Sequence, residues 1–254
     1  MNVNDDMYIV MPNAKMIDNK RSWYPLPTTT NDNSEVHEDF AGFKAAMSEI
    51  VEFMVQVGIK SESKLLVGGF SQGAALSLGL CFQKEIDISG CIALSGYMPC
   101  AKEFMSNDIR CKKIFMSHGT EDNAISFESY ERSYEFLNDK QTAIHTCTGD
   151  FGHTVTKDVT NELTDWILNN FIENNLSNYS KLRNFDFGPE NRSNISCLSP
   201  YINHGIISEK EVIEKSLGKF SFSKNEKFIQ EVLWRTYWKG WLELRPVSYT
   251  HLRA

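Results

Sequence analysis

The sequence predicts an α/β fold with a parallel sheet, followed by a small all-helical segment. Short apolar runs of strand type lie at residues 64–68, 111–117 and 143–147, and longer segments with apolar residues at helical spacing lie around them. Strands that alternate with helices of this length are typical of βαβ units, which form a parallel sheet covered on both sides. Beyond about residue 175 only helical segments follow.

Besides the helix that follows the glycine-rich turn described below, three helices are predicted in the α/β part, at residues 35–57, 126–138 and 157–174, with Gly58 just past the end of the first. Apolar side chains recur at helical spacing in the first (Phe40, Phe43, Met47, Ile50, Met54, Val57) and the third (Val159, Leu163, Trp166, Ile167, Phe171). We interpret these residues as core.

The composition is typical of a globular protein, with 254 residues, 41% hydrophobic and 23% charged. No apolar run approaches the roughly 20 residues of a membrane-spanning helix. The six cysteines have no C-x-x-C spacing, which argues against a zinc site or a disulfide scaffold and favours a reducing, cytoplasmic location. They are Cys81, Cys91, Cys100, Cys111, Cys147 and Cys197.

A glycine-rich turn joins the first predicted strand to a helix over residues 74–82. The turn, Gly69 to Gly73, reads G-F-S-Q-G. G-x-S-x-G between a strand and a helix is typical of a nucleophile elbow, in which a strained serine is exposed above the sheet and the glycines relieve crowding. Ser71 is therefore the candidate nucleophile, and the alternative is a glycine-rich turn with a buried serine.

An elbow predicts its partners in the chain order nucleophile, acid, histidine. Asp122 lies in the loop after the strand at 111–117, and His153 lies in the loop after the strand at 143–147. We expect His153 to take the Ser71 proton during attack and to return it to the leaving group. Asp122 would fix the imidazole tautomer and stabilise the imidazolium.

Other ionisable residues near these positions are competitors. Glu121 and Asp150 are carboxylates within a few residues of the assigned acid and base, and each can also be a solvated loop charge. We expect His118 to support the acid loop structurally. His37 and His145 are interpreted as surface residues.

Four segments of the first part match a known family in order and spacing. They are Gly68 to Ala74, His118 to Asp122, Gly152 to Val155, and Tyr8 to Ala14 with Ser22 to Tyr24. Residues 7 to about 174 thereby resemble the small carboxylesterases and acyl-protein thioesterases of the α/β-hydrolase superfamily, the last segment matching a strand and its following loop. The resemblance implies cofactor-free hydrolysis of carboxylic esters or thioesters through an acyl-enzyme, with Ser71, Asp122 and His153 as the triad. The implied substrates are small esters, lysolipids or acylated proteins.

The beginning of the chain departs from this family's pattern. The family starts with two further strands and a Leu-His-Gly-type loop that supplies one oxyanion N–H, whereas Met1 to Asp6 is a short polar segment. The other oxyanion donor, the backbone N–H of Gln72, is present. We expect the sequence to be truncated at its front and the chain as written to be a poor esterase, because losing one oxyanion donor costs about 10²–10³ in rate.

The charge changes sign near residue 176. Residues 176–254 contain 12 Lys and Arg against 8 Asp and Glu, a net charge of +4, which leaves −11 for residues 1–175 of a chain that carries −7. We therefore predict a hydrolase-like domain over residues 1–175 and a separate helical module over residues 176–246. The basic charge favours a phosphate or nucleic-acid partner for the second module, with a solvated surface as the alternative.

Two helices are predicted in the second module. Ser208 to Glu211 and Ser223 to Glu226 each fit a capping box at a helix start. The first helix would run to Leu217 before Gly218, and the second to about Leu244 before Pro246. The second has a broad apolar face formed by Phe228, Ile229, Val232, Leu233, Tyr237, Trp241 and Leu242.

Three motifs of this module fit the patterns Tyr-x-x-x-Arg, Ser-x-Leu-Ser-Pro-Tyr and Glu-x-x-Trp-Arg. They begin at Tyr179, Ser196 and Glu231. Residues 179–246 thereby resemble the opening of the FAD-binding domain of DNA photolyases and cryptochromes. The resemblance implies that Tyr179, Ser196 and Ser199 hold the FAD pyrophosphate and that Glu231, Trp234 and Arg235 line the flavin pocket.

Two functions from different classes follow from these resemblances. We favour the serine hydrolase, and the alternative is an FAD-binding module for DNA repair or light sensing, which would bring a nucleic-acid partner. The sequence contains residues for only one wall of a flavin-binding pocket. We therefore expect residues 176–246 to bind FAD weakly or not at all. A tryptophan-rich helix that packs against the hydrolase also fits the motifs. Residues 247–254 resemble translated adapter sequence and are left out of the fold prediction.

Overall fold

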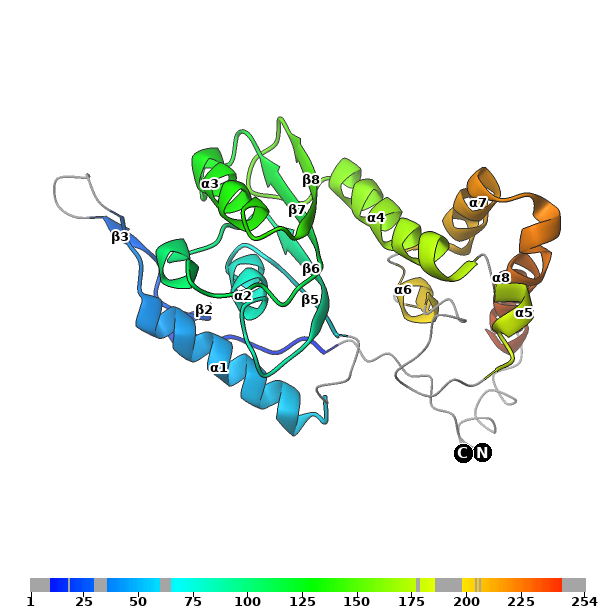
Figure 1. Cartoon of the computed structure of the whole chain (residues 1–254), viewed down its shortest axis with the longest axis horizontal. Coiled ribbons are helices and arrows are strands. Elements are labelled where there is room, and N and C mark those ends of the chain that lie inside the picture. The colour runs from blue at the N-terminus through cyan, green and yellow to red at the C-terminus, as the bar shows by residue number, and fades with distance from the viewer. Residues whose placement is uncertain are drawn as a thin grey trace. The chain divides into compact units, whose positions relative to one another are not determined.

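The structure is a computed structural model that describes residues 10–17, 19–29, 36–59, 65–176, 179–185, 198–203, 205 and 207–243. The chain forms two compact units, Val10–Leu163 and a second that contains Thr164–Ala254 (Figure 1). The division falls inside a helix, whereas the predicted boundary lies between residues 175 and 176. The domain limits stay a prediction.

A four-stranded parallel sheet forms the centre of the first unit. Its strands are β5 (Leu65–Phe70), β6 (Ile88–Leu94), β7 (Lys113–Gly119) and β8 (Ala143–Gly149), in the order β5-β6-β7-β8. The parallel α/β architecture predicted from the sequence is confirmed. The apolar run at Ile88–Leu94 adds a strand that the pattern analysis did not name.

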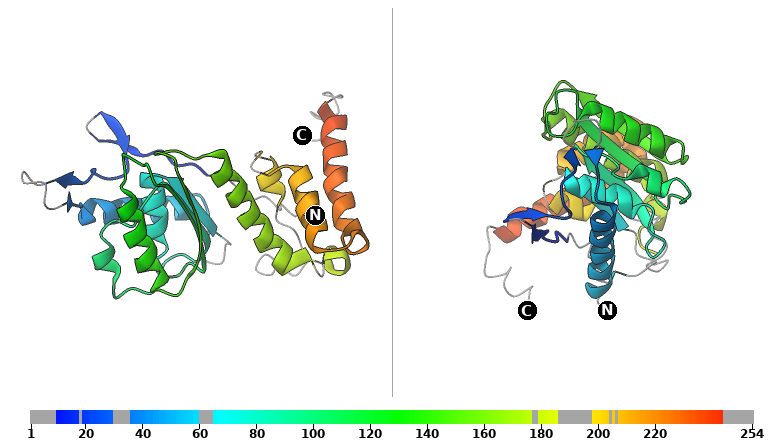
Figure 2. Two further views of the ribbon diagram at one scale, coloured as in Figure 1. Left: turned by 90° about the horizontal axis from the view of Figure 1, so that it is seen from above. Right: turned by 90° about the vertical axis from the view of Figure 1, so that its left-hand side faces the viewer.

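Helices cover one face of this sheet, where α1 (Phe40–Gln56), α2 (Gln72–Leu80) and α3 (Phe127–Asn138) supply apolar side chains to one core. Figure 2 shows these three helices on one side of the strands. A short 3₁₀ helix, Ala101–Phe104, follows β6 and adds Phe104 to the core. The central buried side chains include Phe43, Met47, Leu78, Ile114, Met116 and Leu137.

The start of α4 (Lys157–Asn175), which belongs to the first unit as far as Leu163, contacts the other face of the sheet at β8. Because successive side chains of a strand point to opposite faces, Phe115 points away from the core that holds its neighbours Ile114 and Met116. Its ring stacks on His145 at 5.4 Å, and His145 Nε2 lies 3.1 Å from Glu162 Oε2 of α4. The prediction of helices on both faces is confirmed.

Caps set the helix limits in this unit. Asp39 accepts a hydrogen bond from Gly42 N at 2.9 Å, so α1 begins at Phe40 rather than at the predicted residue 35. Ser126 caps α3 in the same way through Ser129 N. Gly58 has φ +82° just past the end of α1, a conformation that favours glycine.

Two small antiparallel pairs precede the central sheet. β1 (Lys15–Ile17) pairs with β2 (Lys20–Ser22), and β3 (Thr28–Thr29) pairs with β4 (Val36–His37). The expected strand at 8–14 is wrong for residues 10–14, which are irregular, while residues 8 and 9 lie outside the described residues.

The second unit contains α5 (Tyr179–Leu182), α6 (Ser199–Asn203), α7 (Glu209–Lys219) and α8 (Phe222–Glu243). The capping box at Ser208 is confirmed: Ser208 Oγ accepts from Glu211 N, and Glu211 Oε2 accepts from Ser208 N at 2.8 Å. The second predicted box is wrong because α8 already includes Ser223, and Ser221 O accepts from Lys224 N and Asn225 N. Asn225 Nδ2 donates to Ser216 O at 2.7 Å and thereby ties α8 to α7.

Candidate active site

Ser71 occupies a sharp turn between β5 and α2. Its backbone has φ 56° and ψ −118°, a left-handed conformation that is strained for a residue other than glycine. Ser71 N donates to Leu94 O at 2.9 Å, and Ser71 O accepts from Ala75 N at 3.1 Å. These bonds hold the strained turn between the neighbouring strand and the new helix, which is the geometry expected of an elbow.

The glycines of the elbow do not have equal roles. A Cβ on Gly69 would lie 2.3 Å from the carbonyl carbon of Gly73, whereas a Cβ on Gly73 would meet no atom within 4 Å. The expectation that both glycines relieve crowding is therefore wrong for Gly73. Gly96, which the sequence did not single out, is required as well, because its Cβ would lie 2.5 Å from Ala74 Cβ and 3.0 Å from Ser71 O.

This asymmetry predicts different outcomes for two alanine substitutions. Gly69→Ala should lower the free energy of unfolding by about 3 kcal/mol, because the new Cβ collides with backbone that cannot move independently. Gly73→Ala should not destabilise the fold, since alanine raises helix propensity by about 1 kcal/mol over glycine. Urea unfolding of both variants measures the difference, and equal losses would contradict the assignment.

Asp122 and His153 meet beyond the carboxyl ends of the adjacent strands β7 and β8. His153 Nδ1 donates to Asp122 Oδ2 at 2.7 Å. The other carboxylate oxygen accepts from Ala124 N at 2.8 Å and Ile125 N at 2.9 Å. Because Nδ1 carries the proton in this bond, Nε2 of the neutral imidazole keeps its lone pair and can act as a base.

The Asp122 carboxylate is buried and still favoured as an anion. Burial raises the pKa of Asp122, but the hydrogen bonds from Ile125 N–H, His153 and Ala124 N–H outweigh this effect and hold the pKa below its usual value. Asp122 is therefore ionised at neutral pH and can stabilise a protonated His153.

The lowered pKa predicts a pH dependence of stability. The stabilisation from the Asp122 carboxylate is fully present above the pKa of an ordinary aspartate, and it is lost as the pH falls through the lower folded value. Asp122→Asn cannot titrate, so its free energy of unfolding should fall less steeply on acidification than that of the wild type. Urea titrations from neutral to strongly acidic pH test this, and parallel curves would contradict it.

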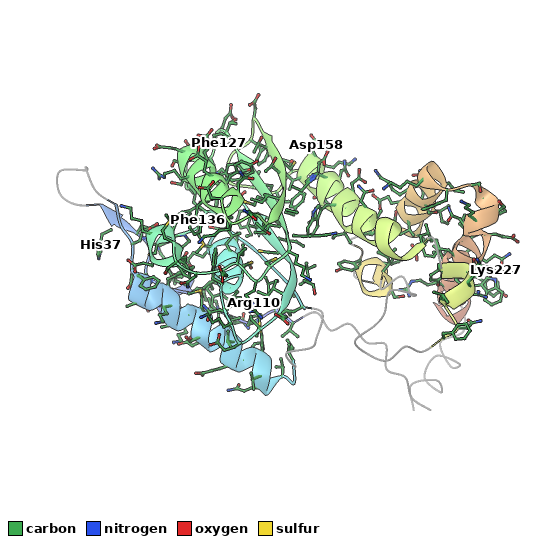
Figure 3. All side chains as sticks on the ribbon, in the orientation of Figure 1. His37, Arg110, Phe127, Phe136, Asp158 and Lys227 are labelled. Atoms are coloured by element: carbon green, nitrogen blue, oxygen red, sulfur yellow. The ribbon has the colours of Figure 1, made fainter. Side chains whose placement is uncertain are left out.

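The competing carboxylates do not reach His153. Glu121 is exposed, and Asp150 is exposed with its Oδ1 accepting from Thr120 Oγ1 at 3.0 Å. His118 is fully buried, with Nε2 lying 3.0 Å from Ile125 O and 3.4 Å from Asp122 Oδ2. The His118 ring stacks on the ring of Tyr130 of α3 at 5.2 Å. The ring of Phe127, which is labelled in Figure 3, also lies beside the His118 ring. These contacts fit the support role expected of His118.

Close backbone packing brings the acid and histidine loops together. A Cβ on Gly119 would lie 1.8 Å from Phe151 O, and Glu121 N donates to this same oxygen at 3.1 Å. Ser95, fully buried with φ 47°, donates from Oγ to Thr154 O at 3.2 Å and so fixes the residue after His153. Ser95 could not be identified from the sequence, because its contact spans 59 residues and has no local signature.

The nucleophile and the histidine belong to neighbouring segments. The ring of Phe70, the residue before Ser71, lies 4.7 Å from the His153 ring. No hydrogen bond joins Ser71 Oγ to His153 within the part of the chain that the structure describes. Such bonds are often long before substrate binds. Gln72 is the first residue of α2, so its backbone N–H has no acceptor inside the helix and is suited to bind an anion.

The residues expected to bind flavin lie in the second unit. The Tyr179 hydroxyl donates to Glu231 Oε2, and Arg183 Nε donates to Glu231 Oε1 at 2.7 Å. Ser199 is exposed at the start of α6, Trp234 is 66% exposed, and Arg235 Nε lies 4.0 Å from Glu209 Oε1. Ser196 lies outside the described residues. Tyr179 and Glu231 are thus hydrogen-bonded to each other. The flavin site stays a prediction.

Among the residues with described positions, no three or more His, Cys, Asp or Glu side chains cluster in a way that could hold a metal ion. Over the same residues, no helix has the length and apolar character needed to span a bilayer.

Comparisons with known proteins show the family of the chain. Residues 3–171 match the model of the phospholipase/carboxylesterase family. Acyl-protein thioesterase 1 homolog 1 of Dictyostelium discoideum is 31% identical over 118 residues, which cover 46% of this chain and 52% of that protein. Acyl-protein thioesterase 1 of Candida albicans is 29% identical over 194 residues, covering 68% of this chain and 79% of that protein.

A solved structure shows the same fold. The crystal structure of Arabidopsis thaliana SOBER1 superposes with a TM-score of 0.50 at 23% identity, covering 62% of this chain and 80% of that one. The chain spans about half the length of the Dictyostelium relative and most of the Candida relative. With the family model matched over most of the α/β unit, the chain belongs to the phospholipase/carboxylesterase family.

Proposed function

We propose that the protein is a serine hydrolase that cleaves carboxylic esters or thioesters through an acyl-enzyme. The observation that carries the proposal is the 2.7 Å bond from His153 Nδ1 to Asp122, placed at the same end of the sheet as the strained turn at Ser71. Ser71 is the nucleophile, His153 the base and Asp122 the orienting acid. Membership of the phospholipase/carboxylesterase family supports this reaction class.

The reaction proceeds in two halves. Ser71 Oγ attacks the acyl carbonyl while His153 Nε2 takes the hydroxyl proton, and the Asp122 carboxylate stabilises the imidazolium. The carbonyl oxygen becomes an oxyanion next to the Gln72 N–H, at the positive end of the α2 dipole. His153 then protonates the departing alcohol or thiol, and water attacks the acyl-serine by the reverse sequence of proton transfers. All these groups belong to the protein, so the reaction needs no cofactor.

The substrate class follows from the relatives in part. Two of them are named acyl-protein thioesterases, which favours an acylated protein over a short soluble ester. A cytoplasmic location is consistent with the free thiols of Cys81, Cys91, Cys100, Cys111 and Cys147.

Burst kinetics test the proposed function. An activated acyl ester and an acyl thioester mixed with the purified protein should each release their leaving group in an initial burst of about one equivalent per active site, followed by slower turnover. The burst reports an acyl-enzyme that forms faster than it hydrolyses. Release no faster than in buffer for both substrate types would contradict the proposal.

A further inference from the structure

The side chain of Gln72 connects the nucleophile elbow to a distant loop. Gln72 Oε1 accepts from Ser22 Oγ at 3.0 Å and from Trp23 N at 3.2 Å, and Gln72 Nε2 donates to Tyr24 O at 3.0 Å. Both ends of the carboxamide are therefore used, and all three bonds go to consecutive residues some 50 positions earlier in the chain. A surface glutamine seldom makes three such bonds, because ordering its side chain costs conformational entropy.

The loop Ser22–Tyr24 is also fixed from its other side. Tyr24 is buried, and its ring packs edge-on against Phe43 of α1 at 5.1 Å. Ser22 ends β2, and its single hydroxyl proton is shared between Gln72 Oε1 and Tyr24 O, which lies 2.7 Å from Ser22 Oγ. Trp23, between these two anchored residues, is half-buried and packs in part against the core.

Gln72 supplies both the oxyanion N–H and the bonded carboxamide, so the length of one glutamine side chain and one hydrogen bond separates this loop from that N–H. The acyl carbonyl must sit at Ser71 Oγ with its oxygen at the Gln72 N–H, so a bound substrate is next to whatever the Gln72 side chain holds. An indole surface suits an apolar acyl chain.

We propose that the Gln72 carboxamide is a positioning group that holds the loop Ser22–Tyr24 as a wall of the acyl site and thereby sets acyl-chain selectivity. The inference rests on the proposed function and adds a role distinct from the backbone N–H of the same residue. Substitution of the side chain leaves the N–H in place, so the two roles can be separated.

Amide hydrogen exchange tests the clamp without any activity. In Gln72→Met the Trp23 amide loses its acceptor and should exchange roughly tenfold faster. The amide of Ala75, bonded to Ser71 O within the elbow, should keep its rate. Gln72→Glu keeps an oxygen that can accept from Ser22 Oγ and Trp23 N. The exchange rate of the Trp23 amide should therefore be closer to the wild-type rate in Gln72→Glu than in Gln72→Met. Gln83→Met is the matched control, because it makes the same change just past the end of α2, where the Gln83 side chain contacts Met47 instead of the loop. An unchanged Trp23 rate in Gln72→Met would overturn the clamp.

Kinetics with a series of esters of increasing acyl length and one leaving group test its consequence. The ratio of kcat/KM for long over short acyl chains should fall about tenfold in Gln72→Met, mainly through KM for the long chains. Ser22→Ala should move the ratio in the same direction, and Gln83→Met should leave it unchanged. If the wild type hydrolyses these esters in a Ser71-dependent manner while Gln72→Met keeps the wild-type ratio, the inference fails and the proposed function stands. If the wild type hydrolyses none of them, the proposed function fails.

Discussion

Replacing Ser71 by alanine should lower kcat by about 10⁴–10⁶-fold, because the residue that forms the acyl-enzyme is removed. Any remaining rate would come from substrate binding and the Gln72 N–H, which can still polarise the carbonyl. The free energy of unfolding should stay close to the wild-type value or rise slightly, since Ser71 Oγ caps no helix N–H. Steady-state hydrolysis of an activated ester, with urea unfolding alongside, measures both.

Ser77→Ala is the matched control for this experiment. Ser77 lies on the same helix α2, and its hydroxyl donates to Gly73 O at 2.8 Å. The Ser77 variant should therefore keep its kcat if Ser71 is the nucleophile. Comparable losses in the two variants would show that the helix, rather than the Ser71 hydroxyl, is what the reaction requires.

Replacing Asp122 by asparagine should lower kcat by about 10⁴-fold. The asparagine oxygen would accept the bonds from Ala124 N and Ile125 N, so its NH₂ group would face His153. His153 Nδ1 would then have to accept rather than donate, which moves the ring proton to Nε2. The imidazole could no longer take the Ser71 proton.

Glu121→Gln and Asp150→Asn are the matched controls, because they neutralise the neighbouring carboxylates in the same way. Both side chains are exposed, and neither bonds to His153. Each should change kcat by no more than about twofold, as is typical of surface substitutions. A large loss in Glu121→Gln or Asp150→Asn together with an active Asp122→Asn would reassign the acid.

The site residues that can be predicted from the sequence are those that lie in short local motifs. The elbow follows from glycines and a serine between a strand and a helix, because only glycine tolerates the approach of Gly73 backbone at position 69. Asp122 and His153 follow from their places after two apolar strands, since parallel strands bring their carboxyl ends to one edge of the sheet. The first residues of α1 and α8 are predicted less well. Asp39 and Ser221 precede these helices in the structure, but other residues nearby are equally plausible as caps from the sequence.

The contacts that align the site could not be predicted, because each joins segments far apart in the chain. Ser95 binds the loop of His153 across 59 residues, and Gln72 binds Trp23 across 49. Serine and glutamine are common at surface positions, so neither residue type carries a signal by itself. Gly96 is similar: its need for glycine arises from Ala74 Cβ, which only the folded chain brings near.

The most direct test of the account is to map the adduct of a serine-reactive phosphonate probe on the purified wild-type chain. We expect one phosphonyl group per chain, found by peptide mass spectrometry on Ser71, with no labelling of Ser71→Ala. An adduct on any other residue, or equal labelling of Ser71→Ala, would contradict it.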